Sequence, residues 1–200
     1  MKEMRVVLPS IERPKKLPVV LSHNEVRQLL RSPKLLKHRL VLAMLYGCGL
    51  RSFELCNLQL KDLDLERMML HIRQGKGRKD RYVPLCAMQV RGLRKYISAE
   101  SPVTWCFNGN DSKGHPVALS TTGMGWILRE ARKHSGIQKE VTTHSLRHSY
   151  ATHLLEMGLD IMSVKDLLGH ADIQTTLIYL HVARSGRQRP FSPLERLYNK

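Results

Sequence analysis

The stretch Thr143-His144-Ser145-Leu146-Arg147-His148 opens a predicted helix that runs from Ser145 to Met157 and is stopped by Gly158. His144 and Arg147 are three residues apart, so their side chains occupy neighbouring positions on the helix surface. Backbone amides and the helix dipole also favour an anion at this end of a helix. An arginine at a helix start often merely pairs with a neighbouring carboxylate, so this stretch alone leaves its role open.

A second stretch of unusual side chains, Gly49-Leu50-Arg51-Ser52-Phe53-Glu54, follows the most apolar part of the sequence. The segment 34–48 predicts a helix that is apolar on most of its faces and ends at the glycines around Cys48. We expect it to be the central buried helix. A short helix is expected to begin at Ser52, with Arg51 and Glu54 near its first turn.

The remaining pattern predicts a mostly helical α+β domain with a small three-stranded antiparallel sheet. Ser22 and Glu25 form a capping box that opens a helix through about Arg31. Two strands are expected within 63–74 and a third at 81–85, joined by the basic, glycine-rich hairpin tip Gly75–Asp80. Further helices are expected at 87–99, 120–135, 161–168 and 173–181, and a loop is expected at 101–116.

Composition points to a polyanionic partner. The 200 residues include 33 lysines and arginines against 17 acidic residues, which gives a formal net charge of +16. We expect double-stranded DNA or RNA rather than a lipid surface, because no basic amphipathic helix dominates. The longest charge-free apolar stretch, Leu40–Leu50, is shorter than the roughly 18 residues that a membrane-spanning helix needs.

The cysteines and the N-terminus indicate the compartment. The four cysteines are scattered without a CxxC pair, so we interpret them as reduced thiols rather than as a disulfide framework or a zinc site. The first residues carry charges throughout and lack the apolar core of a secretory signal. We therefore expect a cytoplasmic, nucleoid-associated protein.

Taken together, five elements resemble the tyrosine recombinase, or phage integrase, family over roughly residues 15–185, with Xer-like spacing. They are the Gly-x-Arg-x-x-Glu-like run at Arg51, a hairpin lysine at Lys76, the His-x-x-Arg pair of residues 144–147, a Leu-Gly-His run ending at His170, and Tyr179 nine residues later. The resemblance implies the catalytic-domain fold of that family. It also implies a site-specific DNA recombinase that needs no metal and no cofactor.

The resemblance assigns a role to each matched residue. Two arginines would neutralise the scissile phosphate, which the tyrosine would attack with the first histidine as its base. The hairpin lysine would protonate the leaving 5′ oxygen, the second histidine would donate to the phosphate, and a carboxylate would orient the basic groups. The implied catalytic set is Arg51, Lys76, His144, Arg147, His170 and Tyr179, with Glu54 as the supporting carboxylate.

Two other functions fit the same scaffold. A type IB topoisomerase-like relaxer uses the same chemistry, but the compact size and the spacing argue against it. A catalytically silent DNA-binding or directionality factor is disfavoured because no expected residue type is missing. His148 and His153 suggest a zinc site, but the sequence offers no obvious third ligand, so helix packing is the favoured interpretation for both.

We expect three parts along the chain: a basic linker or arm at 1–21, the catalytic domain at 22–182, and a C-terminal arm at 183–200. Members of the family usually carry a further N-terminal core-binding domain, which this sequence is expected to lack. The apolar side chains of the C-terminal arm suggest that it docks on a neighbouring protomer in a homo-oligomer, a tetramer on DNA. Folding back on its own domain is the alternative.

Overall fold

The computed structural model describes residues 18–73, 80–180 and 182–183, and the account below concerns these residues. Both predicted arms fall almost wholly outside them, as does the hairpin tip that carries Lys76. The helices are α1 (His23–Arg31), α2 (Leu36–Gly47), α3 (Ser52–Cys56), α4 (Ala87–Glu100), α5 (Thr121–Ser135), α6 (Thr143–Glu156), α7 (Ile161–Leu168) and α8 (Gln174–Leu177), with a 3-10 turn η1 (Leu60–Asp62).

The predicted sheet is confirmed as three antiparallel strands in the order β1-β2-β3. These strands are β1 (Leu63–Asp64), β2 (Met69–Ile72) and β3 (Arg81–Pro84). The last residue of β2 pairs with the first of β3, Ile72 opposite Arg81. The mostly helical α+β fold class is therefore confirmed.

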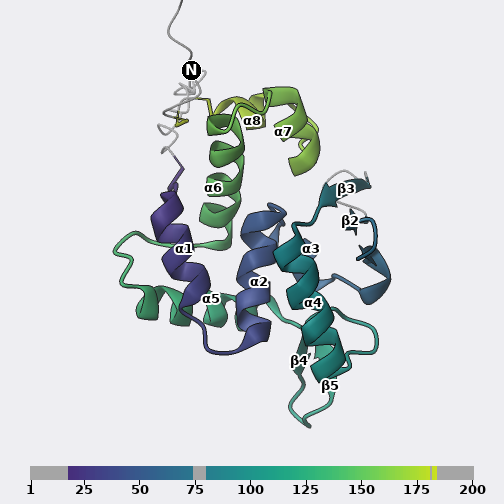
Figure 1. Cartoon of the computed structure of the whole chain (residues 1–200). Coiled ribbons are helices and arrows are strands. Elements are labelled where there is room, and N and C mark those ends of the chain that lie inside the picture. The colour runs from purple at the N-terminus through teal and green to yellow at the C-terminus, as the bar shows by residue number, and fades with distance from the viewer. Residues whose placement is uncertain (1–17, 74–79, 181, 184–200) are drawn as a thin grey trace, which may run out of the picture.

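Helix α2 lies at the centre of the molecule, between α4 and α6 (Figure 1). Its side chains from Leu40 to Leu45 are buried, apart from Ala43, which explains why this segment is apolar on most faces. A second apolar cluster lies between α6, α7 and the segment after α8, and Tyr179 belongs to it. In the view of Figure 1, α7 and α8 lie above the sheet and α3, and α7 packs against β3.

Capping residues set several boundaries as predicted. Ser22 and Glu25 form the expected capping box of α1. Gly136 and Gly169 end α5 and α7 in the left-handed conformation that favours glycine. Helix α6 begins two residues earlier than predicted, because the Thr142 hydroxyl accepts from the Ser145 amide and caps it.

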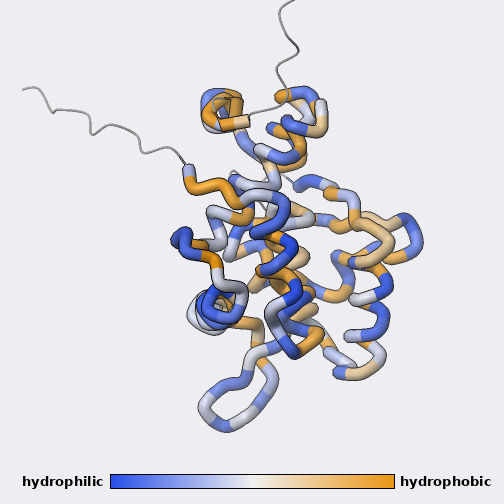
Figure 2. Tube along the Cα trace, turned by 60° about the vertical axis from the view of Figure 1, so that its left-hand side comes forward, coloured by the Kyte–Doolittle hydropathy of each residue, from blue (hydrophilic) through white to orange (hydrophobic). Residues whose placement is uncertain are grey.

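Two predictions about local structure were wrong. The segment 101–116, expected to be a loop, contributes to a second sheet of β4 (Asn108–Asn110) and β5 (Pro116–Ala118). This hairpin projects as a largely hydrophilic loop at the bottom of both views (Figures 1 and 2). Its strands lack alternating apolar residues, and the turn is held by the Asp111 carboxylate, which accepts from the amides of Lys113 and His115.

The last helix is shorter than the predicted 173–181, because the backbone after Leu177 forms tight turns. The amides of Tyr179 and Leu180 donate to carbonyls three residues back, at Thr176 and Leu177. The cysteine interpretation agrees with the fold, since all four are free and three are buried. Within the described residues, no helix combines the length and the apolar character needed to cross a membrane.

Candidate active site

Arg51 lies at the N-terminal end of α3, just after a tight turn at Gly49. Gly49 has a φ of 57°, and a Cβ there would come within 2.7 Å of Cε1 of the Tyr150 ring, so this close approach requires glycine. Glu54 reaches back over the first turn: its carboxylate accepts from the Arg51 amide and from the Arg51 guanidinium, each at 2.8 Å. The predicted Arg51–Glu54 neighbourhood is thus built from local helix-capping geometry.

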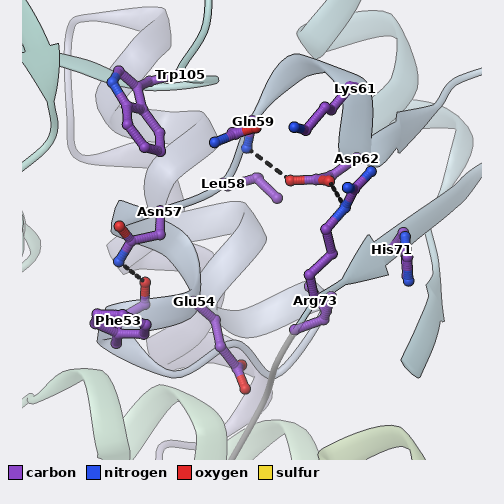
Figure 3. Close-up of a pocket in the computed structure, with 11 residues that line it drawn as sticks. Phe53, Glu54, Asn57, Leu58, Gln59, Lys61, Asp62, His71, Arg73 and Trp105 are labelled. Atoms are coloured by element: carbon purple, nitrogen blue, oxygen red, sulfur yellow. Dashed lines mark hydrogen bonds and ion pairs between the residues drawn. The ribbon is translucent and has the colours of Figure 1, made fainter. Parts of the chain in front are cut away.

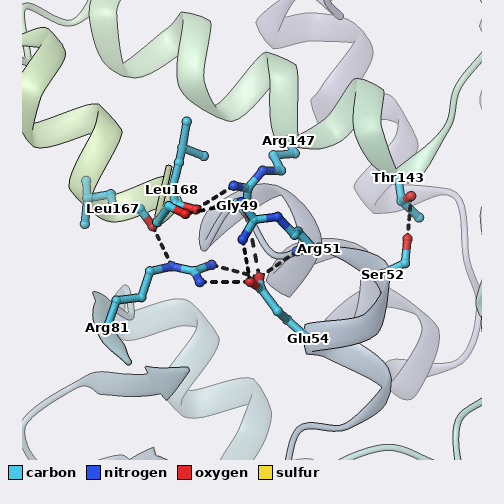
Figure 4. Close-up of polar contacts among 10 residues, drawn as sticks. Gly49, Arg51, Ser52, Glu54, Arg81, Thr143, Arg147, Leu167 and Leu168 are labelled. Atoms are coloured by element: carbon cyan, nitrogen blue, oxygen red, sulfur yellow. Dashed lines mark hydrogen bonds and ion pairs between the residues drawn. The ribbon is translucent and has the colours of Figure 1, made fainter. Parts of the chain in front are cut away.

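Arg81, at the start of β3, forms a second ion pair with the same carboxylate. Its two terminal nitrogens donate to the two carboxylate oxygens of Glu54, both at 2.8 Å (Figure 4). Burial alone raises the pKa of Glu54, but the hydrogen bonds and charge of Arg81, the Arg51 amide and the charge of Arg147 outweigh it and lower the pKa to about 2. Glu54 is therefore ionised at any cellular pH.

Three arginines meet at the C-terminal end of α7, where a helix leaves carbonyls without partners. Arg81 Nε donates to the Leu167 carbonyl at 2.9 Å, and Arg147 Nη2 donates to the Leu168 carbonyl at 2.5 Å. Arg51 Nη2 donates to the carbonyl of the next residue, at 3.3 Å. The negative end of the helix dipole favours these cations. Helix α7 thus gathers three arginines whose mutual repulsion would otherwise separate them.

Arg147 is held from two sides and is almost fully buried. Besides Leu168, its guanidinium donates to the Gly49 carbonyl at the turn before α3 (Figure 4). Burial lowers the pKa of Arg147 to about 10, assisted by the nearby charge of Arg51, yet the group stays protonated at cellular pH. Arg51 is the more accessible of the two, with about 21% of its side chain exposed.

Tyr179 places its hydroxyl within reach of these charges. The residue is only 2% exposed, and burial raises the pKa of its hydroxyl, while the charges of Arg147 and Arg51 act in the opposite direction. The hydroxyl lies 3.0 Å from Nδ1 of His148. The structure therefore brings Tyr179 within electrostatic range of Arg147 and Arg51, although the three residues are far apart in the sequence.

The histidines are arranged differently from the expectation. The exposed His144 ring lies 6.3 Å from that of His148, which stands between it and Tyr179. The His170 ring stacks near the Tyr179 ring at 6.4 Å, and its Nδ1 is 3.0 Å from the Thr176 hydroxyl. The packing interpretation of His148 was incomplete, because its ring hydrogen-bonds the predicted nucleophile.

Arg81 was missed by the sequence analysis. A signal existed, since Arg81 stands at an inward position of β3, two residues before the buried Val83, where an apolar side chain is usual. Lys76 and His181 lie outside the described residues. Strand β3 is tied to Glu54 and to α7, because Arg81, its first residue, bonds both.

A second histidine cluster lies where α1 begins and α6 ends. His23, His153 and Glu156 bring one ligand atom each within 4.8 Å of one another, a group that the sequence analysis did not consider and that does not include His148. His153 is occupied otherwise, however: its Nδ1 lies 2.8 Å from the Tyr46 hydroxyl, and its ring also bonds the Leu21 backbone. We interpret His153 as a structural group that joins α2 and α6 to the start of the chain.

A surface hollow of about 310 Å³ lies on the other side of Glu54, between α3, η1 and β2 (Figure 3). Its polar groups pair with one another: the Asp62 carboxylate accepts from the Gln59 amide at 3.0 Å and meets Arg73 Nε at 2.6 Å. Tyr179 and the histidines near it do not line this hollow. We assign this hollow to the support of the sheet, because the Asp62–Arg73 pair joins η1 to the segment after β2.

Comparison with known proteins matches nearly the whole of the described chain. A sequence model described as the phage integrase family matches residues 19–185. The chain is 41% identical over 171 residues to the tyrosine recombinase XerA of Thermococcus kodakarensis, covering 84% of this chain and 60% of that protein. The crystal structure of a XerA recombinase superposes with a TM-score of 0.76 at 32% identity, covering 93% of this chain and 66% of that one.

A further solved structure is that of the XerH site-specific recombinase bound to palindromic difH substrate, in a post-cleavage complex. It superposes with a TM-score of 0.72 at 27% identity and covers 91% of this chain and 53% of that one. The chain spans about 60% of the length of several curated relatives to which it is 41% identical.

Proposed function

The chain belongs to the phage integrase family, and from this premise we propose that it is a site-specific DNA recombinase that cuts and rejoins strands through a 3′-phosphotyrosine intermediate. The observation that carries the proposal is the Tyr179 hydroxyl, which lies 3.0 Å from His148, the neighbour of Arg147, and whose pKa the charges of Arg147 and Arg51 act to lower. A phenol so placed can attack a phosphate that the same two arginines bind.

In this proposal the arginines replace a metal ion. Each guanidinium can present two parallel donors to the non-bridging oxygens of a phosphodiester, and these charges stabilise the pentacoordinate transition state. Their groups are already fixed by Glu54 and the α7 carbonyls, so little reorganisation accompanies the reaction. The partly exposed Arg51 would meet the phosphate first.

The bonds change as follows in the proposed cleavage. The Tyr179 oxygen passes its proton to a histidine of α6 and forms a bond to phosphorus. The bond from phosphorus to the 5′ oxygen breaks, and that oxygen takes a proton from Lys76. His170 donates to the phosphate, and Glu54 orients the arginines. Because the phosphoryl bond is kept in the protein–DNA link, another 5′ hydroxyl can reseal the strand without ATP.

Two other functions fit the scaffold less well. A relaxing topoisomerase or a silent DNA-binding factor would also carry this fold. The relatives reported above are described as recombinases, and one solved structure holds its DNA after cleavage. The chain also carries the expected type of side chain at each catalytic position that the resemblance implies. Strand exchange is therefore the function that we propose.

For partners, we propose double-stranded DNA and a homo-oligomer, a tetramer on DNA, formed through the arm at 183–200. Support comes from an apolar surface between α6 and α7 that ends near Leu180 and Ala183, where the described chain ends. Size-exclusion chromatography with light scattering, with and without DNA, should show larger assemblies for the full chain than for one ending at Gly186. Equal assemblies for both would contradict the role of the arm.

The function is tested with the full chain and a library of nicked duplexes whose central sequence is randomised. Because of the nick, cleavage releases a short strand, and the covalent adduct is trapped. Denaturing gels should show labelled DNA migrating with the protein. The adduct should vanish in Tyr179→Phe and persist in Tyr82→Phe, an exposed tyrosine on β3. No adduct across the library, in the presence of duplex binding, would favour the silent DNA-binding factor.

A further inference from the structure

The Tyr179 hydroxyl has its hydrogen-bond partner on α6, and that partner is not the predicted base. Nδ1 of His148 lies 3.0 Å from the hydroxyl oxygen, with the ring centroids 5.5 Å apart. His144 lies one turn earlier on the same helix and contacts the His148 ring instead. General-base catalysis first requires hydrogen-bond contact with the proton to be moved, and His148 meets this requirement in the described structure.

We propose that His148, rather than His144, takes the proton of Tyr179 as its oxygen attacks the phosphate, an inference that rests on the proposed strand-transfer function. One bond forms between the Tyr179 oxygen and phosphorus while its proton passes to Nδ1 of His148. The bond to the 5′ oxygen breaks, and that oxygen is protonated by Lys76. On resealing, the His148 imidazolium returns its proton to the phenol.

The protonation state of His148 suits this role. Burial lowers its pKa to about 4, helped by the neighbouring His144 and Arg147, so the ring is neutral at cellular pH. A neutral ring has one acceptor nitrogen. Because the facing phenol keeps its proton, with a pKa above its usual value, we assign the hydrogen of the ring to Nε2 and the acceptor to Nδ1.

The charges around the pair change when DNA binds. The titratable and charged groups nearby are His144 and Arg147 on α6, Arg51 before α3, and His170 after α7. A phosphodiester bound by the arginines offsets their positive charge. The imidazolium form of His148 is then less disfavoured, so its pKa rises from a low value toward the range of an effective base. This phosphodiester is also the one that Tyr179 attacks in the proposed cleavage.

Two substitutions separate proton transfer from positioning. In His148→Asn the side-chain oxygen stands close to the place of Nδ1 and can accept the hydrogen bond, but it cannot take the proton. His148→Ala loses both. His134→Asn, on the exposed surface of α5, is the matched control, and thermal unfolding verifies that each variant is folded.

Single-turnover cleavage is measured on a duplex that the wild-type chain cleaves, with either an ordinary phosphodiester or a 5′-bridging phosphorothioate at the scissile position. A thiolate leaves without an acid. We expect His148→Asn to be slower by about 100-fold on both substrates, whereas the loss in Lys76→Ala should be recovered by the phosphorothioate. The rate of His148→Asn should rise with pH, as phenolate forms, more steeply than that of the wild type.

The outcomes are distinct. If the wild type forms no adduct on any duplex, the proposed function fails. If the wild type cleaves and His148→Asn matches it or exceeds it, the assignment of His148 is wrong and the proposed function stands. Recovery of His148→Asn by the phosphorothioate would also overturn the assignment, because it would make His148 an acid rather than a base.

Discussion

Glu54 and Arg81 form a two-pronged ion pair, with both nitrogen–oxygen distances at 2.8 Å and both side chains less than 10% exposed. The pair joins α3 to β3, and Arg81 continues the connection to the end of α7. Glu54 also binds Arg51, and Arg147 stands 3.9 Å from it. One carboxylate thus offsets the positive charges that the proposed chemistry needs.

Breaking this pair should destabilise the fold. In Arg81→Met, Glu54 loses its strongest partner while remaining buried, and removal of one partner of a buried pair typically costs about 3 kcal/mol or more. Urea unfolding measures the change. Arg67→Met is the control, because Arg67 makes a 3.5 Å pair on the surface and is 85% exposed, so its loss should cost less than about 1 kcal/mol. Equal stability of the two variants would show that the buried pair adds nothing.

Stability should fall in acid because of Glu54. Its pKa is about 2 in the folded chain and 4.5 in the reference state, so its contribution is complete above pH 4.5 and is lost as the pH falls toward 2. Between pH 6 and pH 3 the wild type should lose about 2 kcal/mol more than Glu54→Gln, which has no proton to bind. Urea unfolding across this range gives the free energy of unfolding against pH for both proteins. Parallel curves would contradict the assigned pKa.

The turn before Arg51 should not tolerate a side chain. Gly49→Ala combines a positive φ with overlap of the Tyr150 ring, whereas Gly136→Ala has a positive φ and open space around its Cβ. We expect Gly136→Ala to cost about 1 kcal/mol from backbone strain and Gly49→Ala to cost clearly more. Because the Gly49 carbonyl binds Arg147, the second variant should also cleave DNA more slowly. Equal melting temperatures would argue against the close approach.

The two arginines should resist replacement by lysine. Arg51→Lys and Arg147→Lys keep the charge but lose the planar pair of donors, so single-turnover cleavage should fall by about 100-fold or more. Affinity for the duplex should change little, since many other basic groups remain. Arg129→Lys, exposed on α5, is the control. A matching loss of affinity and cleavage would assign the arginines to binding rather than to the transition state.

Local signals made most of the fold predictable. Capping residues and glycines marked the helix ends, and alternation marked the three-stranded sheet. The β4–β5 hairpin was missed because Asn108-Gly109-Asn110 has no apolar alternation, and its turn is held by a side chain. The motif around Arg51, Arg147 and Tyr179 was readable because these residue types occur in a fixed order.

The roles of Arg81 and His148 could not be read in the same way. Arg81 acts through contacts with Glu54 and α7 that lie 27 and 86 residues away in the sequence. His148 follows Arg147 directly, and its contact with Tyr179 depends on how the segment after α8 folds back onto α6. Both contacts are consequences of tertiary packing: the inward position of Arg81 on β3 marks it as unusual but does not name its partners, and nothing local marks the contact of His148.

The central claim is that Tyr179 becomes covalently joined to a DNA phosphate. It is tested most directly by digesting the trapped adduct with nuclease and protease and sequencing the modified peptide by tandem mass spectrometry. The account predicts a nucleotide linked through its 3′ phosphate to Tyr179 and to no other tyrosine. A nucleotide on a different residue, or one attached through its 5′ phosphate, would contradict it.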